Sequence, residues 1–336
     1  MPNIESVFMN LVTLENIKCA RERIEKFIRK TPLIHSEFIS NLCKGNVYLK
    51  LENLQFTNSF KIRGAINRIL KLSAEQKALG VISASTGNHA QGVALAAQKL
   101  GISAKIVVPT QISAVKLKNI KKYDIKIIQE GNFNEIETRA RIISKSENLT
   151  YISPYNDIDV ITGQGTIALE IFKQIKEIDS IIVPIGGGGL ISGIAVAIKS
   201  LEPNIKIIGV QTKGASTMYE SWKVGKVLHI EEFQTIAKGL SGGLEDGTIT
   251  LELIKKYVDE ISLVQEESIK QAISILWNRD GQIIEGAGAT SVAYILENKD
   301  RFLNKKVIAI LSGGNIGDSL FRTLIQNPYF TLDNIN

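Results

Sequence analysis

The chain has 336 residues, 44% hydrophobic and 22% charged, and this composition excludes a largely disordered protein. Its 40 basic and 34 acidic residues give a net charge of +6, too small an excess to indicate a nucleic-acid-binding protein. Two cysteines cannot form a disulfide framework, and with three histidines they do not fill a spaced zinc site. No signal peptide and no apolar run of about 18 residues is visible. We therefore expect a cytoplasmic protein that binds neither nucleic acid nor a membrane.

Short β-branched runs alternate with helical patterns along the chain. Thr13 is expected to cap a helix whose apolar stripe continues to Ile28. The patterns predict strands at 47–51, 81–84, 105–108, 125–128, 181–185, 205–210 and 307–311, and helices at 88–100, 134–146, 161–175 and 267–279. This alternation indicates an α/β fold with mostly parallel sheets flanked by helices. Because no linker divides the chain, we expect two interleaved domains.

Residues 57–65 form the first segment that indicates chemistry. Ser59 is predicted to cap a helix here, which places Lys61 in its first turn. The positive end of the helix dipole disfavours an ammonium group at that place. The amine is therefore favoured in its neutral, nucleophilic form, which a Schiff-base lysine needs. A solvated surface lysine is the alternative interpretation.

Residues 83–92 form the second such segment. A predicted strand ends in Ser85, Thr86 and Gly87, and an alanine-rich helix follows directly. Backbone N–H groups and hydroxyls at such a helix start bind anions, and this loop has the size for an α-carboxylate. Ordinary capping of the helix is the alternative interpretation.

The third segment contains four consecutive glycines, Gly186 to Gly189, between a predicted strand and a helix. Such a run is tolerated where a ligand must approach the main chain closely. The loop can present several N–H groups to a phosphate, although a tight strand–helix turn is the alternative. It lacks the third glycine of a dinucleotide fingerprint and the lysine of a nucleotide site, which favours a single phosphate ester. A phosphate loop with an activated lysine is typical of pyridoxal phosphate enzymes.

Five motifs together resemble those of the serine/threonine dehydratase family, over roughly residues 10 to 325: SFKIRGA at 59–65, STGNHAQG at 85–92, GGGGL at 186–190, EGAGA at 285–289 and SGGN at 312–315. That family has the tryptophan synthase β-like fold, fold type II of the pyridoxal phosphate enzymes. It includes catabolic threonine ammonia-lyases, serine racemases and hydroxyaspartate ammonia-lyases. The resemblance implies a large cofactor-binding domain of residues 1–75 and 153–336 and a small substrate-side domain of residues 76–152. It also implies a homo-oligomer, either a dimer or a tetramer.

The resemblance further implies a role for each matching residue. Lys61 would bind pyridoxal phosphate covalently and later move the α-proton, with Phe60 packed beside the cofactor. Asn88 would hydrogen-bond the pyridoxal 3-hydroxyl, and Ser312 would face the pyridine nitrogen. The substrate carboxylate would lie among Ser85, Thr86, Gly87 and His89, with the Thr86 hydroxyl also a catalytic candidate, and the phosphate would be bound by Gly186, Gly187, Gly188, Gly189 and Leu190.

Ser312 bears on the type of reaction. A neutral hydroxyl cannot stabilise a protonated pyridinium as a carboxylate would, so the ring becomes a weaker electron sink. That weakness favours prompt β-elimination over transamination. The implied reaction removes water from L-threonine or L-serine and gives 2-oxobutyrate or pyruvate plus ammonia. Thr86 stands where racemase-like relatives have a second proton donor, and its restricted χ1 predicts little racemisation.

Three departures from the family pattern bear on the metal and on the substrate. Gln211 and Thr217 stand where racemase-like members have acidic ligands for a divalent cation, so we expect no metal site. Lys238 stands in place of the aspartate of an Asp-Gly pattern that is common near the substrate in threonine dehydratases. The substrate preference among threonine, serine and hydroxyaspartate therefore stays open, and so does serine racemase activity.

Two further classes of protein are disfavoured. A β-replacement enzyme of the cysteine-synthase type would normally show Thr-Ser-Gly-Asn-Thr in the carboxylate loop, whereas this chain has Asn88-His89. A non-catalytic binding protein on the same fold would lack the lysine that is present as Lys61. The chain leaves no room for the C-terminal regulatory domain of biosynthetic threonine dehydratases, which favours a catabolic enzyme.

Overall fold

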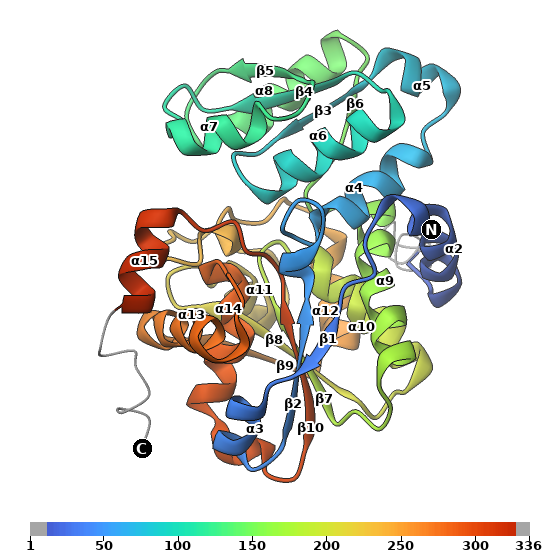
Figure 1. The fold of residues 1–336 in the computed structure, drawn as a ribbon. Helices are drawn as coiled ribbons and strands as arrows, with labels where there is room; N and C mark the ends of the chain where they lie inside the picture. Colours follow the sequence, from blue (N-terminus) through green and yellow to red (C-terminus); the bar gives the residue numbers. More distant parts are fainter. Residues whose placement is uncertain (1–11, 327–336) are drawn as a thin grey trace.

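The computed structural model describes residues 12–326, and it contains two sheets in separate layers (Figure 1). The larger sheet has the strand order β1-β2-β10-β7-β8-β9, and only the β1–β2 pair is antiparallel. The smaller sheet, β5-β4-β3-β6, is parallel throughout. The bounds are β1 Leu33–His35, β2 Asn46–Leu51, β3 Val81–Ala84, β4 Ala104–Val108, β5 Lys126–Gln129, β6 Thr150–Tyr151, β7 Ser180–Pro184, β8 Lys206–Thr212, β9 Glu260–Val264 and β10 Lys306–Leu311. The predicted α/β fold with mostly parallel sheets is confirmed.

Helices cover both faces of each sheet (Figure 1). Around the larger sheet, one face is covered by α2 Leu14–Ile24, α9 Ile158–Gln174, α10 Gly189–Leu201, α11 Thr217–Val224 and α12 Ile249–Tyr257, and the other by α3 Glu37–Cys43, α13 Glu266–Asp280, α14 Gly286–Glu297 and α15 Asp318–Gln326. Around the smaller sheet lie α4 Lys61–Leu70, α5 Ala74–Leu79, α6 Asn88–Leu100, α7 Ala114–Ile120 and α8 Ile136–Ser146.

The central strands are apolar on both sides because each side faces a helical layer. In β10, Val307, Ala309 and Leu311 pack into the core under α13 and α14. The alternate residues, Ile308 and Ile310, pack into the core under α9 and α10. Such continuous β-branched runs are what made these strands visible in the sequence.

All seven predicted strands are present within about two residues of their predicted bounds. Three further strands, β1, β6 and β9, were not predicted. Two of them have only two or three residues, too few for a periodic pattern to show. At the chain's start Thr13 caps α2 as predicted, accepting a hydrogen bond from Asn16 N at 3.1 Å. The helix ends at Ile24 and continues only as one 3-10 turn.

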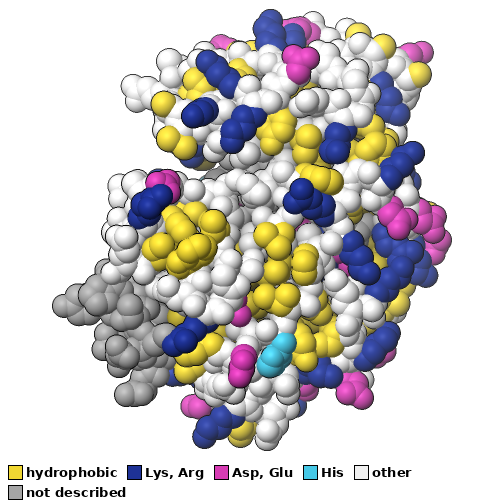
Figure 2. All heavy atoms as spheres, in the orientation of Figure 1, with side chains coloured by type: hydrophobic (Ala, Val, Ile, Leu, Met, Phe, Trp, Pro, Cys, Tyr) yellow, Lys and Arg dark blue, Asp and Glu magenta, His cyan; other side chains and the backbone are white. Residues whose placement is uncertain are grey.

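The smaller sheet forms an upper lobe, and the surface is hollowed between this lobe and the rest of the molecule (Figure 2). Its four strands come from residues 81–151, inside the predicted small domain of residues 76–152, whose exact boundaries stay a prediction. Helix α4 lies between the two parts and packs on both α6 and α9. Within residues 12–326, no helix is both long and apolar enough to cross a membrane.

Candidate active site

The predicted site residues lie on loops that follow β3, β7 and β10 and on the first turn of α4. Ligands of open parallel sheets bind at the carboxyl ends of the strands, and these loops all leave such ends. Two of the loops meet directly at Asn88, which is linked to both Glu285 and Asn315. Two backbone contacts join the α4 entry to the loop after β10. Ser59 forms a β-bridge with Gly313, and Phe60 N donates to Ser312 O at 3.2 Å.

Lys61 is in the first turn of α4, as predicted, but Ser59 does not cap this helix. Phe60 is the capping residue, with helical backbone angles and no capping side chain. Ser59 is drawn instead into the bridge with Gly313, and its buried hydroxyl has no partner among the described residues. The prediction of a Ser59 cap is wrong because a tertiary backbone pairing replaces the local capping geometry.

The Lys61 amine is largely shielded from solvent. Its Nζ donates to Pro154 O at 2.8 Å and lies 5.1 Å from the centre of the Phe60 ring. Burial lowers the pKa of Lys61 to about 8, and the Glu285 carboxylate opposes this shift. A lower pKa is what a nucleophilic lysine needs. Its main cause is therefore burial, whereas the sequence argument had invoked the helix dipole.

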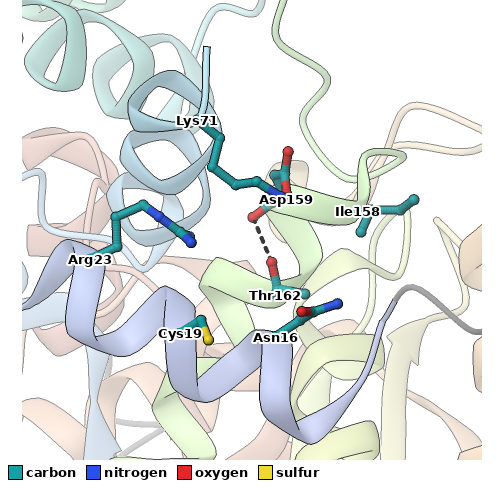
Figure 3. A pocket seen from close by; sticks show the side chains of 7 residues that line it. All are labelled: Asn16, Cys19, Arg23, Lys71, Ile158, Asp159 and Thr162. Carbon is teal, nitrogen blue, oxygen red and sulfur yellow. Dashed lines mark hydrogen bonds and ion pairs between the residues drawn. The ribbon is translucent and has the colours of Figure 1, made fainter. Parts of the chain in front are cut away.

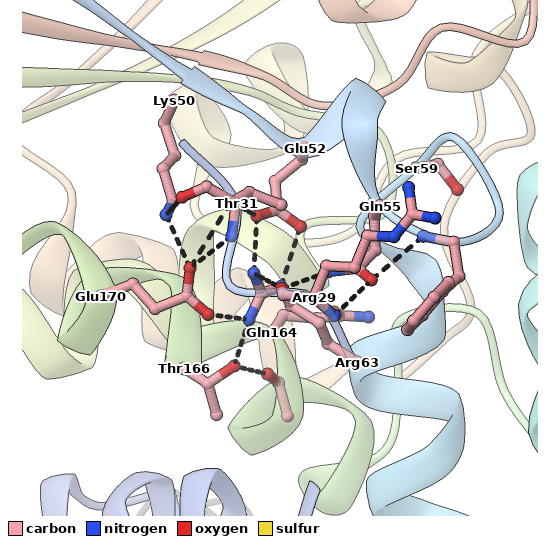
Figure 4. A network of polar contacts seen from close by, with 12 residues as sticks. Arg29, Thr31, Lys50, Glu52, Gln55, Ser59, Arg63, Gln164, Thr166 and Glu170 are labelled. Carbon is pink, nitrogen blue, oxygen red and sulfur yellow. Dashed lines mark hydrogen bonds and ion pairs between the residues drawn. The ribbon is translucent and has the colours of Figure 1, made fainter. Parts of the chain in front are cut away.

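A buried charge network fixes α4 two residues beyond Lys61 (Figure 4). Arg63 is fully buried and pairs with Glu52 and Glu170, each at 2.7 Å. Lys50, also fully buried, pairs with Glu170 at 2.6 Å. Two positive and two negative groups balance, which a buried network requires. Sequence reasoning missed this network, although the charges of Lys50 and Glu52 beside an apolar strand were a visible signal.

The loop predicted to bind a carboxylate leads into α6. Ser85 Oγ accepts a hydrogen bond from Gly87 N at 3.2 Å. Thr86 is largely buried, and its Oγ1 accepts one from Lys116 Nζ at 3.2 Å. Lys116 was not among the predicted site residues, and its position 30 residues further along the chain gave no local signal.

His89 turns its ring toward the lobe's interior. The side chain is buried, and its Nε2 lies 3.0 Å from the carbonyl oxygen of Ile152. Burial, with a smaller effect from the nearby Lys61 ammonium, lowers the pKa of His89 to about 3. The ring is therefore neutral at physiological pH, and Nε2 is the nitrogen that carries the proton. Nδ1 is buried and has no partner among the described residues.

The four-glycine loop ends at the start of α10. Gly188 caps this helix with a φ of +89°, and a Cβ there would lie 2.9 Å from both Ile254 Cδ1 and Thr250 Cβ. A Cβ on Gly187 would lie 2.4 Å from the Tyr155 ring. Only glycine fits both positions. The loop and the first turn of α10 have N–H groups with no acceptor among residues 12–326, namely those of Gly187, Gly188, Gly189 and Leu190. This arrangement fits a phosphate group.

Glu285 is a functional candidate that sequence reasoning did not single out. It occupies the N-cap position of α14 at the start of the EGAGA motif, but its side chain does not cap the helix. Its Oε1 instead accepts a hydrogen bond from Asn88 Nδ2. Burial raises the pKa of Glu285 to about 7, against the opposing effects of Asn88, Lys61 and Lys116. The sequence signal that could have identified Glu285 was a carboxylate directly before the small residues of 286–289.

Gln211 and Thr217, which were predicted to stand in place of acidic metal ligands, both form internal hydrogen bonds. Gln211 Oε1 accepts from Tyr219 N at 2.7 Å, and Thr217 Oγ1 donates to Glu232 at 2.8 Å. In the part of the chain that the structure describes, no three His, Cys, Asp or Glu side chains are grouped to hold a metal ion.

Two partly open cavities lie away from these loops. One of about 200 Å³ lies between α2, α4 and α9 and is lined by Asn16, Cys19, Arg23, Lys71, Ile158, Asp159 and Thr162 (Figure 3). The other, about 660 Å³, lies at the amino ends of β7 and β8. Neither is lined by a predicted site residue, so the candidate site lies outside both cavities, at the loops after β3, β7 and β10.

Comparison with known proteins agrees with this geometry. The family described as "Pyridoxal-phosphate dependent enzyme" matches residues 24–313. An L-threonine ammonia-lyase of Thermotoga maritima is 44% identical over 317 residues, which cover 94% of this chain and 79% of that protein. A catabolic L-threonine dehydratase of Staphylococcus aureus is 48% identical over 312 residues, 91% of this chain and 90% of that protein.

Solved structures of similar proteins share the fold. The crystal structure of serine racemase from Dictyostelium discoideum is 39% identical, with a TM-score of 0.85 over 91% of this chain and 99% of that one. The family match covers most of the chain and includes the lysine, the glycine loop and Ser312. The protein belongs to the family of pyridoxal-phosphate dependent enzymes.

Proposed function

We propose that this protein is a pyridoxal-phosphate-dependent threonine/serine dehydratase, an ammonia-lyase of the cytoplasm. It removes water from L-threonine or L-serine and releases 2-oxobutyrate or pyruvate with ammonia. The observation that carries the proposal is the pair of relatives, at 44% and 48% identity over more than nine-tenths of this chain, that are named as threonine ammonia-lyase and dehydratase. The grouping of Asn88, Glu285 and the loop after β10 around Lys61 supports it.

The residues present fit the cofactor. Lys61 would hold it covalently through Nζ, and Phe60 would pack beside it. The loop from Gly186 to Leu190 would bind its phosphate through the free N–H groups of Gly187 to Leu190. Asn88 would bind the ring 3-hydroxyl, and the Ser312 hydroxyl would face the ring nitrogen. When bound, the cofactor supplies a sink for the electron pair that remains on the substrate Cα.

Lys61 would also be the base that removes the Cα proton. With a pKa of about 8, a larger fraction of its amine is neutral at physiological pH than for an exposed lysine. Its first-turn position on α4 is held by the Arg63 network, which limits movement of the helix backbone. The amine can therefore accept the proton without a change in the fold.

The loop of Ser85, Thr86 and Gly87 would receive the substrate α-carboxylate at the start of α6. His89 follows this loop, and its neutral ring donates to the Ile152 carbonyl. Racemisation would need a proton donor on the face of Cα opposite Lys61, for which Thr86 is the candidate. We expect elimination to dominate, because the neutral Ser312 shortens the lifetime of the carbanion that two-sided protonation needs.

Assembly into a homo-oligomer, a dimer or a tetramer, is part of the same proposal. Trp277 is 37% exposed and packs edge-on against Phe321, and the neighbouring Leu320 is 39% exposed. An assembly contact on this face would bury both of these exposed side chains. Light scattering coupled to size-exclusion chromatography checks the assembly, and a monomer at micromolar concentration would contradict it.

The experiment that tests the function is release of 2-oxo acids from L-threonine and L-serine by the purified protein supplied with pyridoxal phosphate. We expect both products, together with equimolar ammonia. Parallel chiral analysis of the serine that remains distinguishes elimination from racemisation. Accumulation of D-serine as fast as pyruvate would instead favour a racemase.

A further inference from the structure

The segment between β6 and α9 packs against the glycine loop. Tyr155 lies in this segment, which leads from the smaller sheet back to the larger part of the molecule, and its side chain is buried. A Cβ built on Gly187 would overlap the Tyr155 ring, and one built on Gly189 would lie 2.9 Å from Tyr155 Cα. Tyr155 therefore lies directly behind the backbone that carries the free N–H groups of the proposed phosphate site.

The hydroxyl of Tyr155 is held by the chain that precedes α12. Glu245 N donates to the Tyr155 hydroxyl oxygen at 2.7 Å. Asn156, the next residue, donates from Nδ2 to Glu245 Oε2 at 3.2 Å, and its Oδ1 accepts from the N–H of the first residue of α12 at 3.1 Å. Within α12, Thr250 Oγ1 donates to Gly187 O at 2.8 Å. Gly187 is thus fixed both by the Tyr155 ring and by a hydrogen bond from α12.

Glu245 also joins this group of residues to the upper lobe. Its Oε2 accepts a hydrogen bond at 2.8 Å from Arg141, which belongs to α8 (Figure 1). Arg141 is itself fixed on the lobe, because it pairs with Glu137 of the same helix at 2.8 Å and its guanidinium lies 4.3 Å from the centre of the Tyr151 ring. The Arg141–Glu245 pair is therefore a direct link between the lobe and the larger part of the molecule.

We propose that Tyr155 is a positioning residue for the phosphate loop, and that the Arg141–Glu245 ion pair couples the placement of the upper lobe to cofactor affinity. The contacts run from Arg141 through Glu245 and Tyr155 to Gly187. An intact pair keeps Glu245 N on the Tyr155 hydroxyl, and the ring then holds the loop with its N–H groups free for the phosphate. This inference rests on the cofactor site of the proposed function, but it requires no particular substrate.

The same segment reaches the site by a second route. Pro154 O accepts the hydrogen bond from Lys61 Nζ at 2.8 Å, so a change at Tyr155 could act on the lysine and not on the phosphate loop. Pyridoxal distinguishes the two routes, because it has the aldehyde that reacts with the lysine but no phosphate. The ratio of the affinities for pyridoxal phosphate and for pyridoxal therefore reports on the loop alone.

The first test measures both affinities by absorbance titration of the cofactor-free protein, in wild type and in Tyr155→Phe. Phenylalanine keeps the ring behind the loop and removes only the hydroxyl. The loss of one hydrogen bond predicts that the preference for pyridoxal phosphate over pyridoxal falls about three- to ten-fold. The affinity for pyridoxal itself should stay unchanged.

The second test examines the link to the lobe. Arg141→Met should lower the same preference about two- to five-fold, because a partly exposed ion pair contributes less than a buried hydrogen bond. Arg141→Lys keeps the charge and should restore most of the preference. The matched control is Arg139→Met, two residues away on α8, which removes an ion pair between the exposed side chains of Arg139 and Glu130 and should leave the preference unchanged.

The double variant Tyr155→Phe/Arg141→Met tests whether the two residues act in one chain of contacts. Both changes act through Glu245, so the double variant should lose no more preference than Tyr155→Phe alone. Losses that multiply would show that the residues act independently, and they would overturn the coupling to the lobe. An unchanged preference in Arg141→Met would overturn it as well.

The remaining outcomes separate the inference from the proposed function. Equal losses for pyridoxal phosphate and pyridoxal in Tyr155→Phe would assign the effect to Lys61 or to general destabilisation, and would overturn the positioning role. A wild type that binds both compounds equally well would overturn the phosphate site and the inference with it. Normal cofactor binding without release of 2-oxo acid from L-threonine or L-serine would overturn only the proposed function, and the preference ratios would still decide the inference.

Discussion

Glu285 accepts a hydrogen bond from the side-chain amide of Asn88, although the two residues are 197 positions apart. From the other side, Asn315 Nδ2 donates to Asn88 Oδ1 at 2.7 Å. Both ends of the Asn88 amide are thus fixed, and its N–H and oxygen cannot exchange places without losing both bonds. Because Glu285 is also the carboxylate that opposes the lowered pKa of Lys61, it links Asn88, the proposed contact of the cofactor ring, to the amine proposed as the catalytic base.

Glu285→Gln should lower the pKa of Lys61 further. The amide oxygen can still accept from Asn88, but the negative charge that raises the Lys61 pKa is gone. We expect the midpoint to fall by about one unit from its starting value. The measurement is the pH dependence of the rate at which the cofactor-free protein recombines with pyridoxal phosphate. An unchanged or higher midpoint would show that Glu285 does not act on Lys61.

Gly188→Val should weaken cofactor binding by about ten-fold or more, because the loop could no longer keep the geometry that exposes its N–H groups. The φ of +89° and the 2.9 Å approach of Thr250 Cβ both oppose a side chain there. Gly225→Val is the matched control, since Gly225 has a φ of +83° but open space around it at the end of α11. The control should lose only about 1–2 kcal/mol of stability. Equal cofactor affinity in both variants would argue against a phosphate site.

His89 makes the stability of the cofactor-free protein depend on pH. Its pKa is about 3 in the folded protein but near 6.5 when unfolded, so between these values the unfolded state binds more protons. Stability is therefore lost as the pH falls from 6.5 toward 3. Between pH 7 and pH 5 this amounts to about 2 kcal/mol.

Urea unfolding at pH 7 and pH 5 checks this, with His89→Gln as the comparison. Glutamine can donate to the Ile152 carbonyl but does not titrate. We expect the wild type to lose about 2 kcal/mol more than the variant over this interval. The same loss in both proteins would mean that the His89 ring already takes up its proton in the folded state.

The local motifs of the site could be predicted because each is continuous in sequence. The strand, loop and helix around Asn88 and around the glycine run are short-range patterns, and the structure has them at the predicted places. The parts that could not be predicted depend on partners distant in sequence. Ser59 pairs with Gly313, 254 residues away, and so does not cap its own helix. His89 points at Ile152, and no local pattern sets that direction.

The buried ion network is a second feature that no local pattern shows. Arg63 and Glu170 are 107 positions apart, and a sequence pattern cannot reveal which charged side chains meet inside the protein. Arg63→Met should be strongly destabilising, by about 3–5 kcal/mol, because two buried carboxylates would then share only Lys50. Chemical denaturation checks this. Arg322→Met, which removes an exposed ion pair with Asp318, should cause no measurable change. Similar unfolding midpoints for the two variants would contradict a stabilising network.

The most direct test of the account is the release of 2-oxo acid from L-threonine and L-serine by the wild type and by Lys61→Ala. The account predicts that the wild type releases 2-oxobutyrate and pyruvate. Lys61→Ala should lose activity by a factor on the order of 10³ or more, because one residue supplies both the covalent attachment and the base. Lys26→Ala is the control. It removes an exposed lysine whose amine lies over the Phe27 ring, and it should retain full activity. Full elimination activity in a correctly folded Lys61→Ala protein would contradict the assignment.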